Sequence, residues 1–240
     1  MLSYNWNWSI LFRQPYLGWL LEGLRLTVVM AAVSFVLALA IGVLVGMART
    51  APSRPIRALG WVYTALFRNV PLLIQMFLWF YVFPELLPSD VGRWLKRDLY
   101  EPEVTIAVMC LSFYMAARVG EQIRAGIQSV PKGLVSAALA TGLTVNQIRR
   151  YIVMPICLRI LIPPLTTELL ATFKNTSLAL AIGVLEITAR SHQIESSTFH
   201  GFEAFAAATG LYLAISLFTL SLVLPLEKAA RLPGMLKGRS

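Results

Sequence analysis

Residues 26–48 form an unbroken run of 23 residues without a charged side chain. About 20 apolar residues are needed for a helix to cross the hydrocarbon core of a bilayer, so this run predicts a transmembrane helix. The whole chain agrees, because 57% of its residues are hydrophobic and 14% are charged, against about 25% charged in soluble domains. The sequence therefore predicts an all-α integral membrane protein.

Further apolar runs predict four more spans within one transmembrane domain, residues 22–228. Pro71 is expected to kink or start the second span, and Pro163-Pro164 to break the fourth, because proline removes a helical hydrogen bond. The five predicted spans cover residues 26–48, 61–83, 104–124, 156–185 and 205–226.

Two terminal segments lie outside this predicted domain. The amino-terminal residues 1–21 carry Trp6, Trp8, Tyr16 and Trp19, amphipathic rings of the kind that gather at the lipid headgroup level, which predicts an external interfacial arm. Residues 229–240 are expected to form a cytoplasmic tail.

The net charge of +9 is concentrated in three segments that flank the predicted spans. Cytoplasmic loops carry an excess of Lys and Arg, so this pattern places residues 49–57, the segment between the third and fourth spans, and the tail in the cytoplasm. The amino terminus is then outside. The positive charge indicates membrane topology and gives no reason to expect nucleic-acid binding.

Few residues in the chain have the pattern of a catalytic or metal site. Cys110 and Cys157 lie in or beside apolar runs and are interpreted as small buried hydrophobes. His192 and His200 lie in a polar segment, residues 186–203, expected to be a loop; they are interpreted as solvated or as contacts for a partner. The chain has no G-x-x-x-x-G-K-[ST] stretch, so it is not expected to bind ATP by a P-loop.

The segment "SAALATGLTVNQIRRYIVMP", residues 136–155, is too polar to be a span. A short helix is expected to end at Gly142, since glycine suits the left-handed turn after a helix. Thr144 and Gln147 have the spacing of a capping box, which predicts a second helix from Val145 until Pro155 ends it. Two interpretations stay open: an elbow that inserts into a groove of a partner, or an amphipathic hairpin on anionic lipid.

Lys174 is predicted to lie deep in the fourth span, where an ammonium is costly unless it faces a polar cavity or a partner. With Asn175, Thr176 and Ser177 beside it, it is a candidate to receive a substrate carboxylate. The alternative is that Lys174 snorkels to the outer interface or pairs with Glu168 or Glu186. Gln75, a lone amide at mid-span, either faces the same pathway or packs on another helix.

Two further pairs have helical spacing. Glu121 and Arg124, three residues apart, are expected to pair near the cytoplasmic boundary, either as a gate or as a helix-stabilising interfacial pair. Gly42 and Gly46, four residues apart, either allow another helix to approach closely or reflect the high glycine content of membrane helices.

The loop also resembles a known signature. Ala137, Ala138, Gly142, nine further residues and then Ile152 and Pro155 match the pattern E-A-A, three residues, G, nine residues, I-x-L-P of binding-protein-dependent ABC importer permeases. This chain has Ser136 in place of the glutamate and Met154 in place of the leucine. The stretches "LFRNVPLLIQMF", "AARVGEQIRAGIQSVPKG" and "LLATFKNTSLALAIGVLEI" are similar to the polar amino acid branch, and the two ends of the chain are similar to permeases of glutamate/aspartate importers.

The resemblance implies a transport subunit of the bacterial cytoplasmic (inner) membrane that is not itself an enzyme and binds no cofactor. ATP and Mg would be bound by a dimer of cytoplasmic ABC ATPase chains. A second permease subunit, often a sister chain, and a periplasmic amino acid-binding protein would complete the importer. The elbow of the loop would be the coupling helix that enters a cleft of the ATPase.

Two functions of other classes compete with the importer. A stand-alone secondary carrier driven by an ion gradient usually has paired inverted repeats with broken helices in both halves, whereas the sequence predicts such a break in the fourth span alone. A membrane scaffold for a cytoplasmic enzyme would explain the loop but not an intramembrane lysine.

Overall fold

A computed structural model describes residues 4–230, and every regular element in that range is helical. Four of the helices are long and apolar enough to cross a membrane, and a bent helix pair can supply a fifth span. The predicted all-α membrane fold is thus confirmed. The tail residues 231–240 and residues 1–3 of the predicted arm fall outside the described residues.

The elements follow one another with short connections. The first half of the described chain contains η1 (Trp8–Phe12), α1 (Tyr16–Arg49), α2 (Arg54–Asn69), α3 (Leu72–Phe77), η2 (Leu78–Val82), η3 (Phe83–Leu86), α4 (Ser89–Arg93) and η4 (Trp94–Asp98). The second half contains α5 (Pro102–Gln128), α6 (Lys132–Ala140), α7 (Val145–Ile148), η5 (Arg149–Val153), α8 (Met154–Asn175), η6 (Thr176–Ile182), α9 (Ile187–Thr198) and α10 (Gly201–Ala230).

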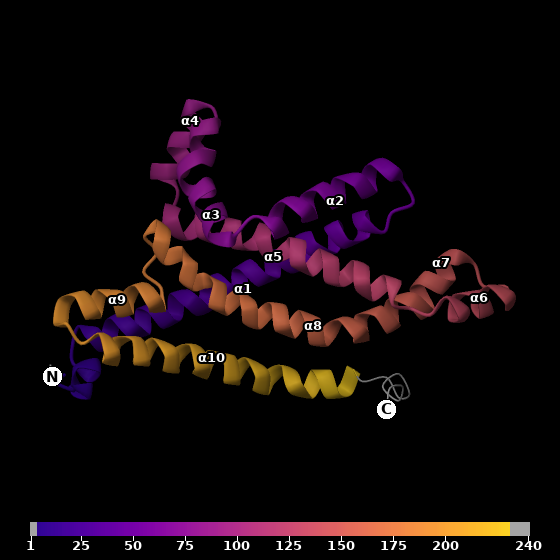
Figure 1. The fold of residues 1–240 in the computed structure, drawn as a ribbon. Helices are drawn as coiled ribbons and strands as arrows, with labels where there is room; N and C mark the ends of the chain where they lie inside the picture. The colour runs from indigo at the N-terminus through magenta and orange to yellow at the C-terminus, as the bar shows by residue number, and fades with distance from the viewer. Residues whose placement is uncertain (1–3, 231–240) are drawn as a thin grey trace.

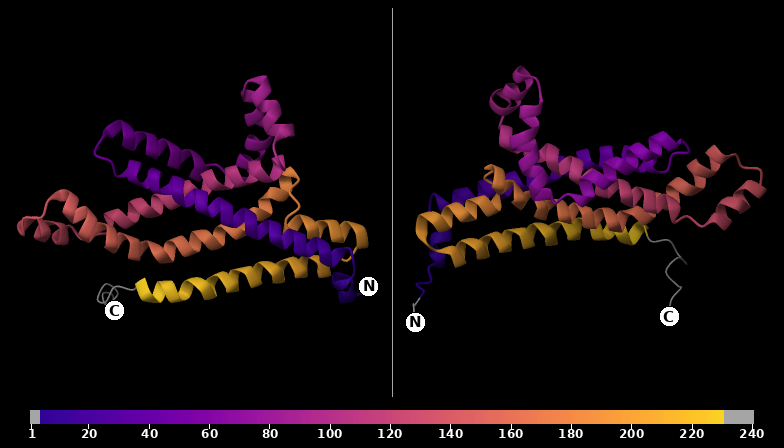
Figure 2. Two further views of the ribbon diagram at one scale, coloured as in Figure 1. Left: turned by 180° about the vertical axis from the view of Figure 1, so that it is seen from behind. Right: turned by 45° about the horizontal axis from the view of Figure 1, so that its top comes forward.

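The long helices α1, α5, α8 and α10 run alongside one another and form the body of the molecule (Figure 1). The α6–α7 loop projects beyond one end of this body, and the amino-terminal segment and α9 lie at the other end (Figures 1 and 2). The segment from α3 to η4 rises from the side as a helical hairpin. Apolar side chains such as Val36, Leu44 and Phe218 are more than 60% exposed on the outside of the body, as lipid-facing residues are.

Glycines allow α1 and α5 to pack closely. A Cβ at Gly42 would lie 2.5 Å from Cγ1 of Val119, and one at Gly46 would lie 2.6 Å from Cγ2 of Ile123. Gly120 on α5 is as tightly enclosed, because its Cβ would lie 2.7 Å from Cγ1 of Val45. The structure therefore favours close packing over chance for Gly42 and Gly46, and the α1–α5 pair is the centre of the body.

The second predicted span is divided. α2 and the helical segment Leu72–Leu86 meet at an angle of 103°, with Pro71 as the residue before α3. Pro71 thus starts a new helical segment, which is one of the two outcomes expected of it. The amide nitrogen of Gln75 donates hydrogen bonds of 2.8 Å to the carbonyls of Phe67 and Val70. It therefore gives hydrogen-bond partners to carbonyls at the end of α2, which the bend leaves without partners in the helix.

The prediction that Pro155 ends a helix is wrong. Residues Val145–Ile182 form one continuous helix, in which Pro155 lies in the first turn of α8. The preceding η5 is a π-helical turn, and the N–H of Met154 donates to the carbonyl of Arg149, five residues back. This wider turn accommodates the proline, which lacks an N–H of its own.

The prediction that Pro163-Pro164 breaks the fourth span is also wrong, since both prolines lie inside α8. Neighbouring helices can hold a proline-containing membrane helix in shape. Cys157 and Leu161, which lie within the two turns before the prolines, are buried in a cluster with Val119 and Ile123 of α5. This packing keeps α8 helical up to the prolines.

Two further boundaries differ from the sequence-based prediction. α1 begins at Tyr16, so the end of the predicted arm already belongs to the first long helix. Residues 187–198 form α9 and not a loop. The signal for this helix is Glu186, whose carboxylate accepts hydrogen bonds of 2.9 Å from the N–H groups of Thr188 and Ala189 as an N-cap.

Substituting Gly42 by leucine should destabilise the protein, because the side chain would have to displace Val119 in the α1–α5 contact. We expect a loss of about 1–3 kcal/mol of stability, typical of overpacking, measured as a lower thermal unfolding midpoint in detergent. Gly210→Leu is the matched control, since no atom lies within 4 Å of a Cβ at Gly210. Equal midpoints for the two variants would contradict the close contact.

Candidate functional site

The α6–α7 loop has a defined backbone turn at Gly142. This residue has a φ of +86°, and α6 ends in a Schellman motif. In that motif the N–H of Leu143 donates to the carbonyl of Ala138 at 3.3 Å, and the N–H of Gly142 donates to the carbonyl of Leu139 at 3.0 Å. The elbow expected at Gly142 is confirmed, and its conformation is one that glycine favours.

The next helix starts with the expected capping box. The backbone N–H of Thr144 donates to the side-chain oxygen of Gln147 at 2.8 Å, and the N–H of Gln147 donates to the Thr144 hydroxyl at 3.4 Å. Around this elbow Ser136 and Ala137 are exposed and Ala138 is buried. The loop therefore presents a fixed surface of small and apolar groups, to which the exposed Leu134, Leu139 and Val145 contribute.

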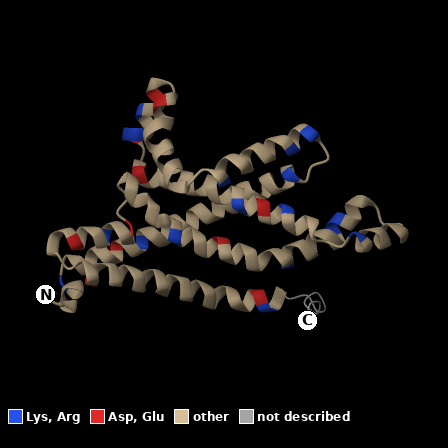
Figure 3. Ribbon diagram, in the orientation of Figure 1, with Lys and Arg blue, Asp and Glu red and all other residues tan. Residues whose placement is uncertain are grey.

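The loop is joined rigidly to the interior of the body. The continuous helix Val145–Ile182 begins at the capping box and reaches past Lys174. A displacement of the loop can therefore be transmitted along one helix to the region of Lys174. Figure 3 shows Lys and Arg gathered at the α6–α7 end and at the connection between α1 and α2.

The structure places four of the five predicted pathway residues, Lys174 to Ser177, at the junction of α8 and η6. Lys174 is exposed and has no ion-pair partner within 4 Å among residues 4–230. Asn175 contacts the sulfur of Met115 at 3.6 Å. The hydroxyls of Thr176 and Ser177 donate to the carbonyls of Phe173 and Lys174, each at 2.7 Å. The ammonium of Lys174 is thus available to bind an anion, whereas the hydroxyls of Thr176 and Ser177 stabilise the backbone at the α8–η6 junction.

The two carboxylates considered as partners of Lys174 are engaged elsewhere. Glu168 is 3% exposed and accepts from Nε of Arg118 at 2.6 Å and from its Nη2 at 3.3 Å. Glu186 accepts from the hydroxyl of Tyr212 at 2.6 Å and caps α9. Burial raises the pKa of the Glu186 carboxyl, although these hydrogen bonds oppose the rise.

The Arg118–Glu168 pair was not identified from the sequence. It joins α5 to α8 within the body, and the amide of Gln122 adds a hydrogen bond of 3.4 Å to Glu168. Glu168 lies 50 residues from Arg118 on another helix, and no local pattern marks such a pairing.

Glu121 and Arg124 do form the expected ion pair, with Nε of Arg124 2.7 Å from Glu121. Arg49 of α1 joins them, with its Nη2 3.4 Å from Glu121. The carboxylate therefore connects α1 to α5 next to the α6–α7 end of the body. This geometry favours an interfacial clamp, and a gating role for the pair stays a prediction.

The remaining candidates have structural contacts. Gln75 is 4% exposed and holds the α2–α3 bend by its amide nitrogen, so the structure gives it a packing role; a role in the pathway stays a prediction. His192 and His200 lie near Glu195 and Glu203, at 3.5 and 3.6 Å. Among the described residues no group of three or more His, Cys, Asp or Glu side chains has the arrangement of a metal site.

Comparison with known proteins identifies relatives over nearly the whole chain. The family model of the binding-protein-dependent transport system inner membrane component matches residues 38–232. The glutamate/aspartate import permease protein GltJ of Escherichia coli is 38% identical over 247 residues, covering 99% of this chain and 100% of the relative. The nopaline transport system permease protein NocM of Agrobacterium fabrum is 34% identical over 210 residues, covering 87% and 86%.

The fold has counterparts among solved structures. One crystal structure of an amino acid ABC transporter with histidines matches with a TM-score of 0.81 at 23% identity, covering 94% of this chain and 100% of that chain. At this identity the match supports the fold alone. The helical arrangement described above is thus one that solved ABC transporters share.

Removing the Glu168 carboxylate should destabilise the protein by leaving Arg118 without its partner. For Glu168→Leu we expect a loss of about 2–3 kcal/mol, at or below the low end for a buried pair because the Arg118 side chain is 38% exposed. Thermal unfolding in lipid nanodiscs measures this. The double variant Arg118→Leu with Glu168→Leu should be more stable than Glu168→Leu.

Glu85→Gln is the control for this experiment, because Glu85 pairs with Lys96 on the hairpin and its side chain is 71% exposed. Its effect should be small, because solvent screens an exposed pair. A Glu168→Leu variant as stable as Glu85→Gln would contradict a stabilising role for the buried pair.

Proposed function

The chain belongs to the family of binding-protein-dependent transport system inner membrane components, and on this premise we propose that it carries acidic amino acids through an ATP-driven importer. The substrates proposed are glutamate and aspartate. The protein is a transport subunit, and the membrane it serves is the bacterial cytoplasmic (inner) membrane. It moves its substrate without making or breaking a covalent bond.

The observation that carries the substrate proposal is the similarity to a glutamate/aspartate permease over 99% of the chain. NocM, at 34% identity, is named for a different substrate, so the family alone leaves the amino acid open. The exposed ammonium of Lys174 supports an anionic substrate, because an unpaired cation inside a membrane domain is stabilised when it binds a carboxylate.

The proposed importer combines this chain with three kinds of partner protein. The α6–α7 loop faces the cytoplasm and docks into a cleft of an ABC ATPase dimer, which binds ATP and Mg. A second permease subunit, a sister chain, completes the pathway, and a periplasmic binding protein delivers the amino acid. The exposed apolar side chains of the long helices contact membrane lipid.

Coupling follows from the continuous helix Val145–Ile182. When the ATPases close, the loop moves with them, and the helix carries this displacement to Lys174. The Arg118–Glu168 pair makes α5 move with α8. The pathway would therefore open and close at the α8–η6 junction without local unfolding.

Family membership favours the importer over the stand-alone secondary carrier and the membrane scaffold. Such a carrier usually has broken helices in both halves, whereas among the described residues the fourth span is a continuous helix and the bent pair of α2 with Leu72–Leu86 is the one broken span. Both alternatives predict a function that does not need an ATPase partner.

Gly142→Val should leave the protein in the membrane but reduce copurification of the ATPase at least tenfold. A β-branched residue at a φ of +86° is strained, so the elbow would change shape. Gly133→Val is the matched control on the same loop, because no atom lies within 4 Å of a Cβ at Gly133. Copurification is measured by quantitative immunoblotting at equal permease yield, and unchanged association of Gly142→Val would contradict docking through the elbow.

Lys174→Ala should weaken glutamate uptake while ATPase association persists. Loss of a charge-assisted hydrogen bond costs about 1.5–3 kcal/mol, or about tenfold to a hundredfold in apparent affinity. The measurement is uptake of labelled glutamate in cells, with aspartate, glutamine and arginine as competitors. Lys96→Ala on the hairpin is the control.

Two outcomes would contradict these proposals separately. Wild-type kinetics for Lys174→Ala would remove Lys174 from the pathway. Stronger competition by arginine or glutamine than by aspartate would contradict the acidic substrate but not the importer.

A further inference from the structure

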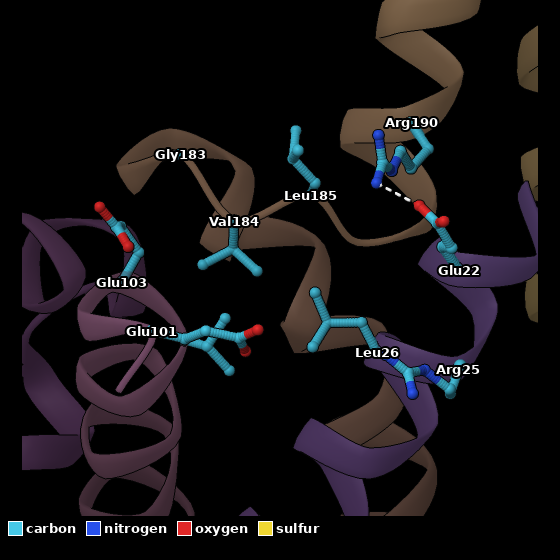
Figure 4. A pocket seen from close by; sticks show the side chains of 10 residues that line it. Glu22, Arg25, Leu26, Glu101, Glu103, Gly183, Val184, Leu185 and Arg190 are labelled. Carbon is cyan, nitrogen blue, oxygen red and sulfur yellow. Dashed lines mark hydrogen bonds and ion pairs between the residues drawn. The ribbon is translucent and has the colours of Figure 1, made fainter. Parts of the chain in front are cut away.

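A cavity of about 360 Å³ is lined by residues of α1, α5 and α9 (Figure 4). The first part of α1 and α9 lie at the end of the body opposite the α6–α7 loop (Figure 1). The cavity is formed by the first part of α1, the start of α5 and the connection from η6 into α9, and we refer to it as the α1–α5–α9 cavity. Its volume falls at the low end of the range of about 300–1,000 Å³ typical of small-molecule sites. None of the predicted pathway residues lines it.

Charges of opposite sign line this cavity. Arg25 extends from α1 on one side, and Glu101 and Glu103 extend from the start of α5 on the other (Figure 4). Within the described part of the chain none of these three side chains has an ion-pair partner within 4 Å. The cavity therefore keeps a cation and two carboxylates apart, where each can still bind a ligand.

A fourth charged group closes the cavity beside α1. Nη2 of Arg190 donates to Glu22 at 2.5 Å, and Nη1 donates to Gln193 at 2.9 Å. The Nε atom of Arg190 is buried and has no hydrogen-bond partner among the described residues. Gly23 allows this approach, because a Cβ there would lie 3.0 Å from Cγ of Arg190. Arg190 is thus held in place at the wall of the cavity.

Apolar side chains complete the lining between the charged walls. Leu26 of α1 lies between Arg25 and Glu101 (Figure 4), and Val104 of α5 and Val184 of the η6–α9 connection also line the cavity. Val184 is 1% exposed, so this part of the wall is anchored in the core. Gly183 has a φ of +94° and turns the chain sharply there. The cavity thus combines charged walls with a fixed apolar surface.

We propose that the α1–α5–α9 cavity binds the zwitterionic head group of an α-amino acid before it enters the pathway. Arg25 receives the α-carboxylate, and Glu101 with Glu103 receives the ammonium. Leu26 and Val184 contact the aliphatic part of the side chain, and Arg190 is close enough to the same space to favour a side-chain carboxylate. This inference rests on the proposed function, which makes this end of the body the external one.

The charge pattern distinguishes this ligand from simpler ions. A phosphate or a lipid headgroup without an ammonium would pair with Arg25 but would leave two carboxylates facing its negative charge. A metal cation would pair with the carboxylates but would be repelled by Arg25. A zwitterion can pair with Arg25 through its carboxylate and with Glu101 and Glu103 through its ammonium. Both contacts are charge-assisted hydrogen bonds.

The test is binding of L-glutamate to the full chain in lipid nanodiscs, without ATPase or binding protein, measured by saturation-transfer NMR. Glutamate should bind, and 4-aminobutanoate and glutarate should compete at least tenfold more weakly, because they lack the α-carboxylate and the ammonium respectively. Glutamine should compete, since it keeps the same head group.

Variants locate the binding in the cavity. Arg25→Gln and the double variant Glu101→Gln with Glu103→Gln should each weaken glutamate binding about tenfold or more. Leu185→Trp should do so by filling the cavity without changing its charge, since Leu185 lines it and is 44% exposed. Arg93→Gln, an exposed charge on the hairpin, is the control and should bind as the wild type does.

Several results would overturn the proposal. They are absence of glutamate binding, binding unchanged in Arg25→Gln, or competition by glutarate equal to that by glutamate. Unchanged glutamate binding together with loss of binding-protein-stimulated ATP hydrolysis in Arg25→Gln would make the cavity a docking contact instead.

Failure of this proposal can be told apart from failure of the proposed function. If glutamate does not bind the isolated chain but the assembled importer takes it up, the cavity assignment is wrong and the function stands. If Arg25-dependent binding is found but no ATPase copurifies, the cavity assignment holds and the importer is wrong.

Discussion

The fold depends on one constraint: a backbone in lipid must satisfy its hydrogen bonds within the protein wherever a helix bends or stops. At three interruptions among the described residues a specific group supplies the missing hydrogen bond. Gln75 donates to the carbonyls left open at the α2–α3 bend, and the π-helical turn before Pro155 supplies a five-residue hydrogen bond. Thr176 donates to Phe173 where α8 gives way to η6. Hydrogen bonds therefore stabilise the backbone at the α2–α3 bend, at the π-helical turn before Pro155 and at the α8–η6 junction.

Because the bends and helix ends are held by hydrogen bonds, each long helix can move as one unit. The elbow at Gly142 fixes the shape of the loop, and the helix that follows runs without a break from the loop to Ile182. Arg118 and Glu168 then connect this helix to α5, which packs on α1 through glycines. A force applied at the loop thus reaches the body through packed helices and one buried ion pair, and a permease needs such a connection.

Features set by neighbouring residues were predictable from the sequence. Hydrophobic runs predicted long apolar helices, the Thr144–Gln147 spacing predicted a helix start, and the spacing of Gly42 and Gly46 suggested a close contact, because each depends on local geometry. The Arg118–Glu168 pair and the α1–α5–α9 cavity depend on the relative rotation of separate helices, which no local pattern specifies. The continuity of α8 through its prolines was missed because packing overrode the local preference.

The central claim is that this chain transports only as part of an ATP-driven assembly. The most direct measurement is uptake of labelled glutamate into proteoliposomes that contain the chain with or without its ATPase and sister permease. The account predicts accumulation only when the full assembly, internal ATP and external binding protein are all present. Uptake by the chain alone, driven by a sodium or proton gradient, would contradict it.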